Sequence, residues 1–149
     1  MSYSKPYAES CDQNKEPILS VLREVFTEPC TVVEIGSGTG QHAVHFAEVL
    51  SHLRWQPTVR SESLPGIHAW LEDAGLDNVL APLELDAAQA HWPVDSAEGV
   101  FSANTVHIMS WPEVQSLFQG LGRVMLPHAR FCLYGPFNYG GRYTSESNQ

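Results

Sequence analysis

The sequence predicts a single α/β domain built on a doubly wound, mostly parallel sheet of about five strands. Three observations lead to this prediction. The chain has 149 residues, which suits one domain rather than two. Apolar residues make up 43% of it and charged residues 17%, a globular composition. Stretches of strand and helix character alternate from residue 14 to residue 135 with Gly and Pro between them, which is typical of α/β folds.

The first elements are marked by turn and cap residues. We expect a helix to begin near Asn14, a good N-cap, because Pro17 suits a first turn and apolar residues follow at helical spacing. Residues 31–35 are short, β-branched and mostly apolar, as a strand buried on both faces should be. A loop with three alternate glycines follows at residues 36–40, and an apolar helix follows at residues 43–50.

The remaining elements continue the alternation. A helix over residues 64–74 should be closed by Gly75, at a position where helices favour a left-handed residue. Ser110 and Glu113 form a capping box that begins another helix. Further strands are expected at residues 55–59, which Pro57 interrupts, and at 79–85, 99–103 and 129–134. Right-handed crossovers between parallel strands then give a Rossmann-like sheet.

Charge and composition narrow the class of protein. The net charge of −9, with no basic cluster, disfavours binding to nucleic acid or to a membrane surface. No apolar run of about 18 residues is present, and the polar residues 1–6 lack the hydrophobic stretch of a secretory signal, so we expect a cytoplasmic protein. Three widely spaced cysteines, Cys11, Cys30 and Cys132, are expected to remain reduced thiols.

The glycine loop is the strongest functional signal. A strand that delivers three alternate glycines to a helix N-terminus aims backbone N–H groups at a ligand. Gly36, Gly38 and Gly40 are spaced G-x-G-x-G, which fits neither the dinucleotide fingerprint nor the Walker pattern. Glu34, two residues earlier in an apolar strand, needs a partner, which either a ligand amine or backbone N–H groups would supply.

This E-x-G-x-G-x-G arrangement resembles motif I of class I S-adenosylmethionine-dependent methyltransferases. Further stretches resemble one family among them, the family that includes methyltransferase-like protein 26. These stretches are NKEPIL at 14–19, EIGSGTGQH at 34–42, WQP at 55–57, AN at 103–104, HI at 107–108 and YGPFNYGG at 134–141. The resemblance implies S-adenosylmethionine as cofactor and S-adenosylhomocysteine as product.

The resemblance also implies roles for individual residues. The cofactor's methionine and ribose would be held by Glu34, Gly36, Ser37, Gly38 and Gly40. Asp86 would reach the adenine, and Asn104 would line the cofactor site at the end of the fourth strand, on the acceptor side. His107 follows the same strand; it is either a general base, since its usual pKa suits neutral pH, or a hydrogen-bonded loop histidine.

We expect no metal site, because no third ligand stands at a recognisable spacing from His42 and His45, which are interpreted as histidines of a helix surface.

Two departures from the family pattern bear on function. Relatives usually place an acid just after the WQP segment to hold the ribose hydroxyls, but residues 58–61 contain none. Glu62 is the nearest carboxylate, although Arg60 would compete for it. Class I enzymes also add a helix and an antiparallel strand pair after the fifth strand. We therefore expect a C-terminally truncated form without that pair, with an exposed fifth-strand edge suited to a homodimer.

Three functions remain open at this point. The leading one is a methyltransferase that acts on a small molecule or a protein. The alternative is a non-catalytic module that binds S-adenosylmethionine or has a regulatory role. A nicotinamide-dependent oxidoreductase is disfavoured, because the glycine spacing is wrong for a dinucleotide.

Overall fold

A computed structural model describes residues 8–89, 91–103, 109–135, 137–139 and 142–144 of the chain. The helices are α1 (Glu9–Val25), α2 (Gln41–Val49), η1 (Ser61–Ser63), α3 (Leu64–Ala74) and α4 (Trp111–Val124). The strands are β1 (Thr31–Glu34), β2 (Arg54–Val59), β3 (Leu83–Glu84), β4 (Ala97–Ala103), β5 (Met125–Tyr134), β6 (Phe137–Tyr139) and β7 (Arg142–Thr144). Among the described residues, no helix combines the length and the apolar character needed to cross a bilayer.

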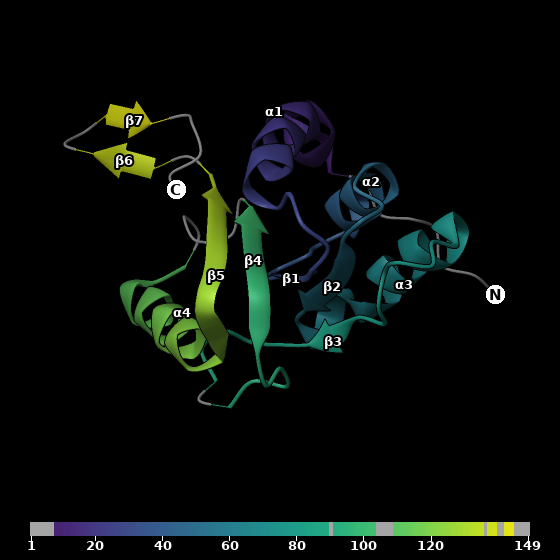
Figure 1. Cartoon of the computed structure of the whole chain (residues 1–149). Helices are drawn as coiled ribbons and strands as arrows, with labels where there is room; N and C mark the ends of the chain where they lie inside the picture. The colour runs from purple at the N-terminus through teal and green to yellow at the C-terminus, as the bar shows by residue number, and fades with distance from the viewer. Residues whose placement is uncertain (1–7, 90, 104–108, 136, 140–141, 145–149) are drawn as a thin grey trace.

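Five parallel strands form one sheet in the order β3-β2-β1-β4-β5, which confirms the predicted α/β fold (Figure 1). The chain moves outward from β1 to β3 and then crosses back to place β4 on the other side of β1. The carboxyl ends of β1 and β4 therefore lie at a topological switch point, where open α/β sheets bind their ligands. The glycine loop after β1 lies at this point.

The core fills both faces of the sheet. Helices α1 and α2 cover one face, where Phe46, Trp55 and Phe101 form an aromatic group with ring centroids 5.7–5.8 Å apart. Helix α4 covers the other face with Leu117 and Leu121. The predicted capping box of α4 is present, and Gly75 ends α3 in the left-handed conformation as expected.

Helix α1 begins at Glu9, so the expectation of a start near Asn14 was wrong. Pro17 consequently lies inside the helix, where a proline forfeits one backbone hydrogen bond. Burial of Ile18 and Leu22 at 1% exposure or less offsets this loss. Asn14 caps nothing, because its side chain contacts His42 of α2 instead. Tertiary contacts therefore extend the helix beyond its local cap signal.

Strand β2 continues through Pro57 because of where that residue faces. Backbone groups of alternate residues, Trp55 and Val59, face β3: Trp55 N donates to Asn78 O and Leu85 N donates to Val59 O. Pro57 has the same orientation, so its missing N–H removes no bond to β1. The Gln56 side chain bridges the gap by donating to Pro57 O and Ala81 O, each at 2.9 Å. Because Pro57 supplies no N–H on this side of β2, the ladder is interrupted and the predicted 79–85 strand is reduced to Leu83–Glu84 and one isolated bridge at Val79.

The last strands differ from the expectation in extent. Strand β5 begins at Met125, directly after α4, rather than at Ala129. Strands β6 and β7 pair with each other in an antiparallel two-stranded sheet of their own. In the described part of the chain, β5 pairs only with β4 and forms one edge of the main sheet.

Candidate functional site

The glycine loop bends tightly between β1 and α2. Gly36, Gly38 and Gly40 have φ values of 74°, 57° and 94°, a region that L side chains rarely adopt. Ser37 fastens the loop to β2, since Ser37 N donates to Thr58 O at 2.7 Å and Thr58 N donates to Ser37 Oγ at 3.0 Å. The loop is thus held by backbone geometry and leaves Gly38 exposed.

Glu34 is buried beneath this loop at 1% exposure. Trp55 Nε1 donates to Glu34 Oε1 at 3.0 Å, and the Ser37 hydroxyl also bonds the carboxyl group. Burial raises the pKa of Glu34 to about 7, although both hydrogen bonds favour the charged form. The partner of the carboxyl group is therefore the indole of Trp55 in β2. The sequence had suggested a ligand amine or backbone N–H groups instead.

A crevice of about 140 Å³ opens beside the loop, at the carboxyl ends of β1, β2 and β3; we call it the strand-end crevice. Its apolar lining comes from Ile35, Leu85 and Met109, with Gly36 at the loop. Its charged lining is Arg60, Asp86 and Glu113, which come from three different segments. An apolar slot with charged groups at its edge suits a ring system that carries hydrogen-bonding substituents.

Both carboxylates of the strand-end crevice are oriented by backbone N–H groups. Asp86 Oδ1 accepts from Ala88 N at 3.0 Å, and Glu113 Oε1 accepts from Ser110 N at 2.8 Å. The bonds from Ser110 are the main reason why the pKa of Glu113 is lowered, and the charge of Arg60 adds to this effect. The bonds from Ala88 N and Ser110 N use Asp86 Oδ1 and Glu113 Oε1, and the Ser110 hydroxyl also bonds the Glu113 carboxyl group. A carboxylate offers about four acceptor sites, so each acid keeps acceptor capacity for a ligand.

The other half of the loop is covered by the start of α1. Ala8 N donates to Gln41 Oε1 at 2.5 Å, and Gln41 Nε2 donates to Ala8 O at 3.3 Å. Gln41 Oε1 also accepts from Thr39 Oγ1 at 2.9 Å, which links α1 to the loop. Burial and the nearby charge of Glu34 both raise the pKa of Cys11. The loop therefore borders the strand-end crevice at Gly36 and is tied to the start of α1 through Gln41.

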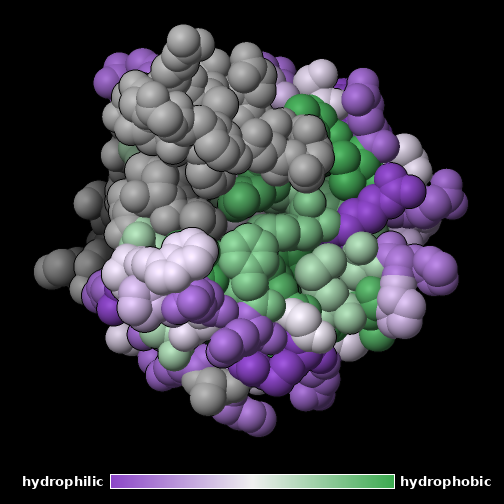
Figure 2. Space-filling view, turned by 90° about the vertical axis from the view of Figure 1, so that its left-hand side faces the viewer, coloured by the Kyte–Doolittle hydropathy of each residue, from purple (hydrophilic) through white to green (hydrophobic). Residues whose placement is uncertain are grey.

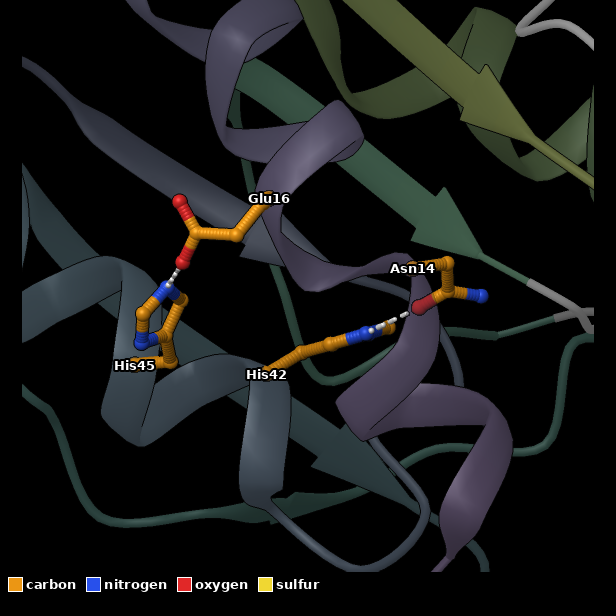
Figure 3. Close-up of polar contacts among 4 residues, drawn as sticks. All are labelled: Asn14, Glu16, His42 and His45. Atoms are coloured by element: carbon orange, nitrogen blue, oxygen red, sulfur yellow. Dashed lines mark hydrogen bonds and ion pairs between the residues drawn. The ribbon is translucent and has the colours of Figure 1, made fainter.

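Two further polar contacts hold α1 on α2 (Figure 3). His42 Nε2 lies 3.0 Å from Asn14 Oδ1, and His45 Nε2 lies 3.2 Å from Glu16 Oε2. Burial lowers the pKa of His42 to about 4, and its ring stacks on Phe46 with centroids 5.0 Å apart. The interpretation of His42 as a surface histidine was wrong, because the longer α1 covers it. In the described segments, no three metal-ligating side chains gather.

The predicted site residues are only partly brought together. Glu34, Gly36 and Ser37 meet at the loop, and Asp86 lines the strand-end crevice. Glu62 is exposed on η1, where its Oε2 lies 3.7 Å from Arg60 Nε, and it does not line the crevice. Asn104 and His107 lie outside the described residues.

Sequence reasoning did not assign Arg60 or Glu113 to the crevice. The capping box that orients Glu113 was visible in the sequence, but its closeness to β3 was not.

Comparisons with known proteins identify a family and a fold for the chain. A family model described as "Protein of unknown function (DUF938)" matches residues 5–149. The structure of the S-adenosylmethionine-dependent methyltransferase SibL is similar, with a TM-score of 0.75 and 21% identity over 87% of this chain and 37% of that one. The structure of mitomycin 7-O-methyltransferase MmcR is also similar, with a TM-score of 0.74 and 16% identity over 87% of this chain and 37% of that one.

A SAM-dependent methyltransferase from Aquifex aeolicus gives a TM-score of 0.67 and 23% identity over 82% of this chain and 65% of that one. These likenesses show that the chain has the fold of class I methyltransferases. The chain spans less than two thirds of the length of each of these three structures.

Proposed function

Because the chain belongs to the DUF938 family and has the fold of S-adenosylmethionine-dependent methyltransferases, we propose that it binds S-adenosylmethionine and transfers its methyl group. The observation that carries the proposal is the strand-end crevice, which opens beside Gly36. Its apolar slot suits an adenine ring, and its two oriented carboxylates suit the amino and hydroxyl groups of an adenosine. The resemblance to the methyltransferase-like protein 26 family supports the same proposal.

Within this proposal, different residues bind different parts of the cofactor. Gly36, Ser37, Gly38 and Gly40 hold the ribose and methionine by close backbone approach, and Asp86 accepts from the adenine. Glu34, which the resemblance assigned to the cofactor, is buried and contacts Trp55 and Ser37, so within this proposal it supports the loop. The bound cofactor would supply an electrophilic methyl on a sulfonium. The protein contributes position and the exclusion of water, so no catalytic triad is required.

Fewer residues are proposed for the part of the site that binds the methyl acceptor. Asn104 remains proposed for the cofactor and acceptor side, and His107 for accepting the acceptor's proton. The net charge of −9 favours a small molecule or a protein segment over nucleic acid as the methyl acceptor. A cytoplasmic location agrees with the predicted reduced state of the thiols.

A non-catalytic binding module is the second candidate, and one observation favours it. The chain after β2 carries Arg60, and the nearest acid, Glu62, is paired with it outside the crevice. Such a module would bind S-adenosylmethionine without turning it over. A radiolabelled methyl-transfer assay over candidate acceptors separates the two, since only the enzyme produces S-adenosylhomocysteine.

Replacing Asp86 with Asn is expected to weaken the binding of S-adenosylhomocysteine about tenfold, because one charged hydrogen bond is lost. The Asn side chain can still accept from Ala88 N, so the turn is kept. Isothermal titration measures the effect, with the exposed Asp77→Asn as a matched control. Heat from neither S-adenosylmethionine nor S-adenosylhomocysteine with the unmodified chain would contradict the proposed function.

We also propose that two copies of the chain associate through the β5 edge. Strand β5 pairs with β4 on one side only in the described residues. Leu126 of β5 is 46% exposed, and Phe118 of α4, whose ring contacts Phe131 of β5, is 49% exposed. Figure 2 shows apolar surface on the side of the molecule that carries α4 and β5. Backbone groups that have no partner strand in the described segments, next to apolar side chains, favour strand pairing between copies.

Sedimentation equilibrium is expected to show a dimer that Leu126→Lys shifts towards monomer. Val49→Lys, at an exposed position of α2, is the matched control and should leave the dimer intact. A monomer for the unmodified chain at every concentration would contradict the association.

A further inference from the structure

We propose that Glu113 of α4, rather than an acid after β2, accepts the ribose hydroxyls of the cofactor. This inference rests on the proposed function and deepens it. It starts from the mismatch at the end of β2, where a carboxylate is expected and a guanidinium is found. Arg60 lines the strand-end crevice there, but a guanidinium has only donors, so a hydroxyl proton needs another acceptor.

Glu62 does not supply that acceptor in this structure. Its side chain is 68% exposed, and Oε2 lies 3.7 Å from Arg60 Nε. It stands on η1 and is not among the residues that line the strand-end crevice. For Glu62 to reach a ligand in the crevice, this ion pair and the turn that holds it would have to rearrange.

Glu113 already stands in the crevice and is held in place. It lies in the first turn of α4, where its Oε1 accepts from Ser110 N at 2.8 Å and its N donates to Ser110 Oγ at 3.4 Å. This capping box orients the side chain, and the Ser110 hydroxyl also bonds the carboxyl group, which keeps further acceptor sites for a ligand. The crevice therefore holds an acceptor whose geometry is set before a ligand arrives, which reduces the entropy lost on binding.

Glu113 shares the lining of the strand-end crevice with both Arg60 and Asp86. The positive charge of Arg60 lowers the pKa of Glu113, whereas the charge of Asp86 raises it. Asp86 follows β3, where the resemblance assigns it to the adenine, so it is not the carboxylate that we assign to the ribose. Glu113, close to Arg60 at the end of β2, is then the carboxylate at the ribose end, and Arg60 donates to the same hydroxyl oxygens.

The test compares ligands with and without the ribose hydroxyls. Glu113→Gln is expected to weaken the binding of S-adenosylhomocysteine about tenfold and to leave the binding of its 2′,3′-dideoxy counterpart unchanged. Glu62→Gln, the matched control, should change neither affinity. Gln at the third helical position also completes a capping box, so the Tm of Glu113→Gln should match that of the unmodified chain.

A second control separates the helix cap from ligand binding. Ser110→Ala removes the side-chain half of the cap and keeps the carboxylate, so it should lower the Tm and cause no loss of affinity that depends on the hydroxyls. An equal loss for both ligands in Glu113→Gln would overturn the inference. So would a loss that disappears only with a ligand lacking the 6-amino group, because Glu113 would then contact the base.

The inference and the proposed function fail in different ways. If the unmodified chain binds S-adenosylhomocysteine but Glu113→Gln binds it equally well, this inference alone is overturned. A hydroxyl-dependent loss in Glu62→Gln instead of Glu113→Gln also overturns this inference and leaves the proposed function standing. If the unmodified chain binds neither ligand, the proposed function is overturned and this inference with it.

Discussion

Replacing Glu34 with Gln is expected to raise the free energy of unfolding at pH 8 by up to about 3 kcal/mol and to change it little at pH 4. The pKa of Glu34 rises from 4.5 in the unfolded chain to about 7 in the fold, mainly through burial. Above pH 7 the fold must hold a buried charge, whereas below pH 4.5 the group is neutral in both states. Its contribution to stability is therefore present in acid and lost as the pH rises from 4.5 through 7. Gln can still accept from Trp55 Nε1.

The titration of His42 changes the free energy of unfolding in the opposite direction over almost the same pH range. Its pKa falls from 6.5 to about 4 through burial, so its contribution is present above pH 6.5 and lost as the pH falls through 4. The slopes of Glu34 and His42 oppose each other between pH 4.5 and 6.5. Burial and the charge of Glu34 raise the pKa of Cys11, so its thiol stays protonated throughout this range.

Urea unfolding between pH 4.5 and 8 measures this opposition. Glu34→Gln should lose stability towards acid more steeply than the unmodified chain. His42→Gln, whose amide can still bond Asn14 Oδ1, should gain stability towards acid. A Glu34→Gln curve parallel to that of the unmodified chain would show that Glu34 is not the buried acid described here.

Replacing Gly38 with Asn is expected to abolish the binding of S-adenosylhomocysteine while the chain stays folded. A Cβ at Gly38 would meet nothing within 4 Å, and Asn tolerates a φ of 57° better than most residues. The added side chain would occupy the open space in front of the loop, where the proposed function places the cofactor. Isothermal titration and a thermal melt measure the two effects.

Gly40→Asn is the matched variant. We expect it to destabilise the fold, because its side chain would clash with α3. A Cβ at Gly40 would lie 2.7 Å from Ile67 Cγ1 and 3.3 Å from Trp70 Cβ, so helix α3 would have to move. Overpacking of this kind costs about 1–3 kcal/mol before the backbone strain at φ 94° is added. Unchanged affinity in Gly38→Asn would refute the position proposed for the cofactor.

The placement of the elements was largely readable from the sequence because their signals are local. The three glycines, the Ser110–Glu113 capping box and the left-handed Gly75 each depend on residues within one or two turns of chain. Alternating strand and helix patterns then predicted the parallel sheet, since few topologies satisfy the rule of right-handed crossovers. Five strands and the glycine loop were established in this way.

The partners of the buried and charged groups were decided only by the tertiary structure. Glu34 and Trp55 are 21 residues apart, and Asn14 and His42 are 28 apart, so no local pattern connects them. The Arg60–Glu62 pair was anticipated, but the presence of Glu113 in the crevice was not. Turn and cap chemistry acts over a few residues along the chain, whereas hydrogen bonds and charges act over a few ångströms in space. The sequence by itself therefore determined the frame of the site, and packing determined which side chains complete it.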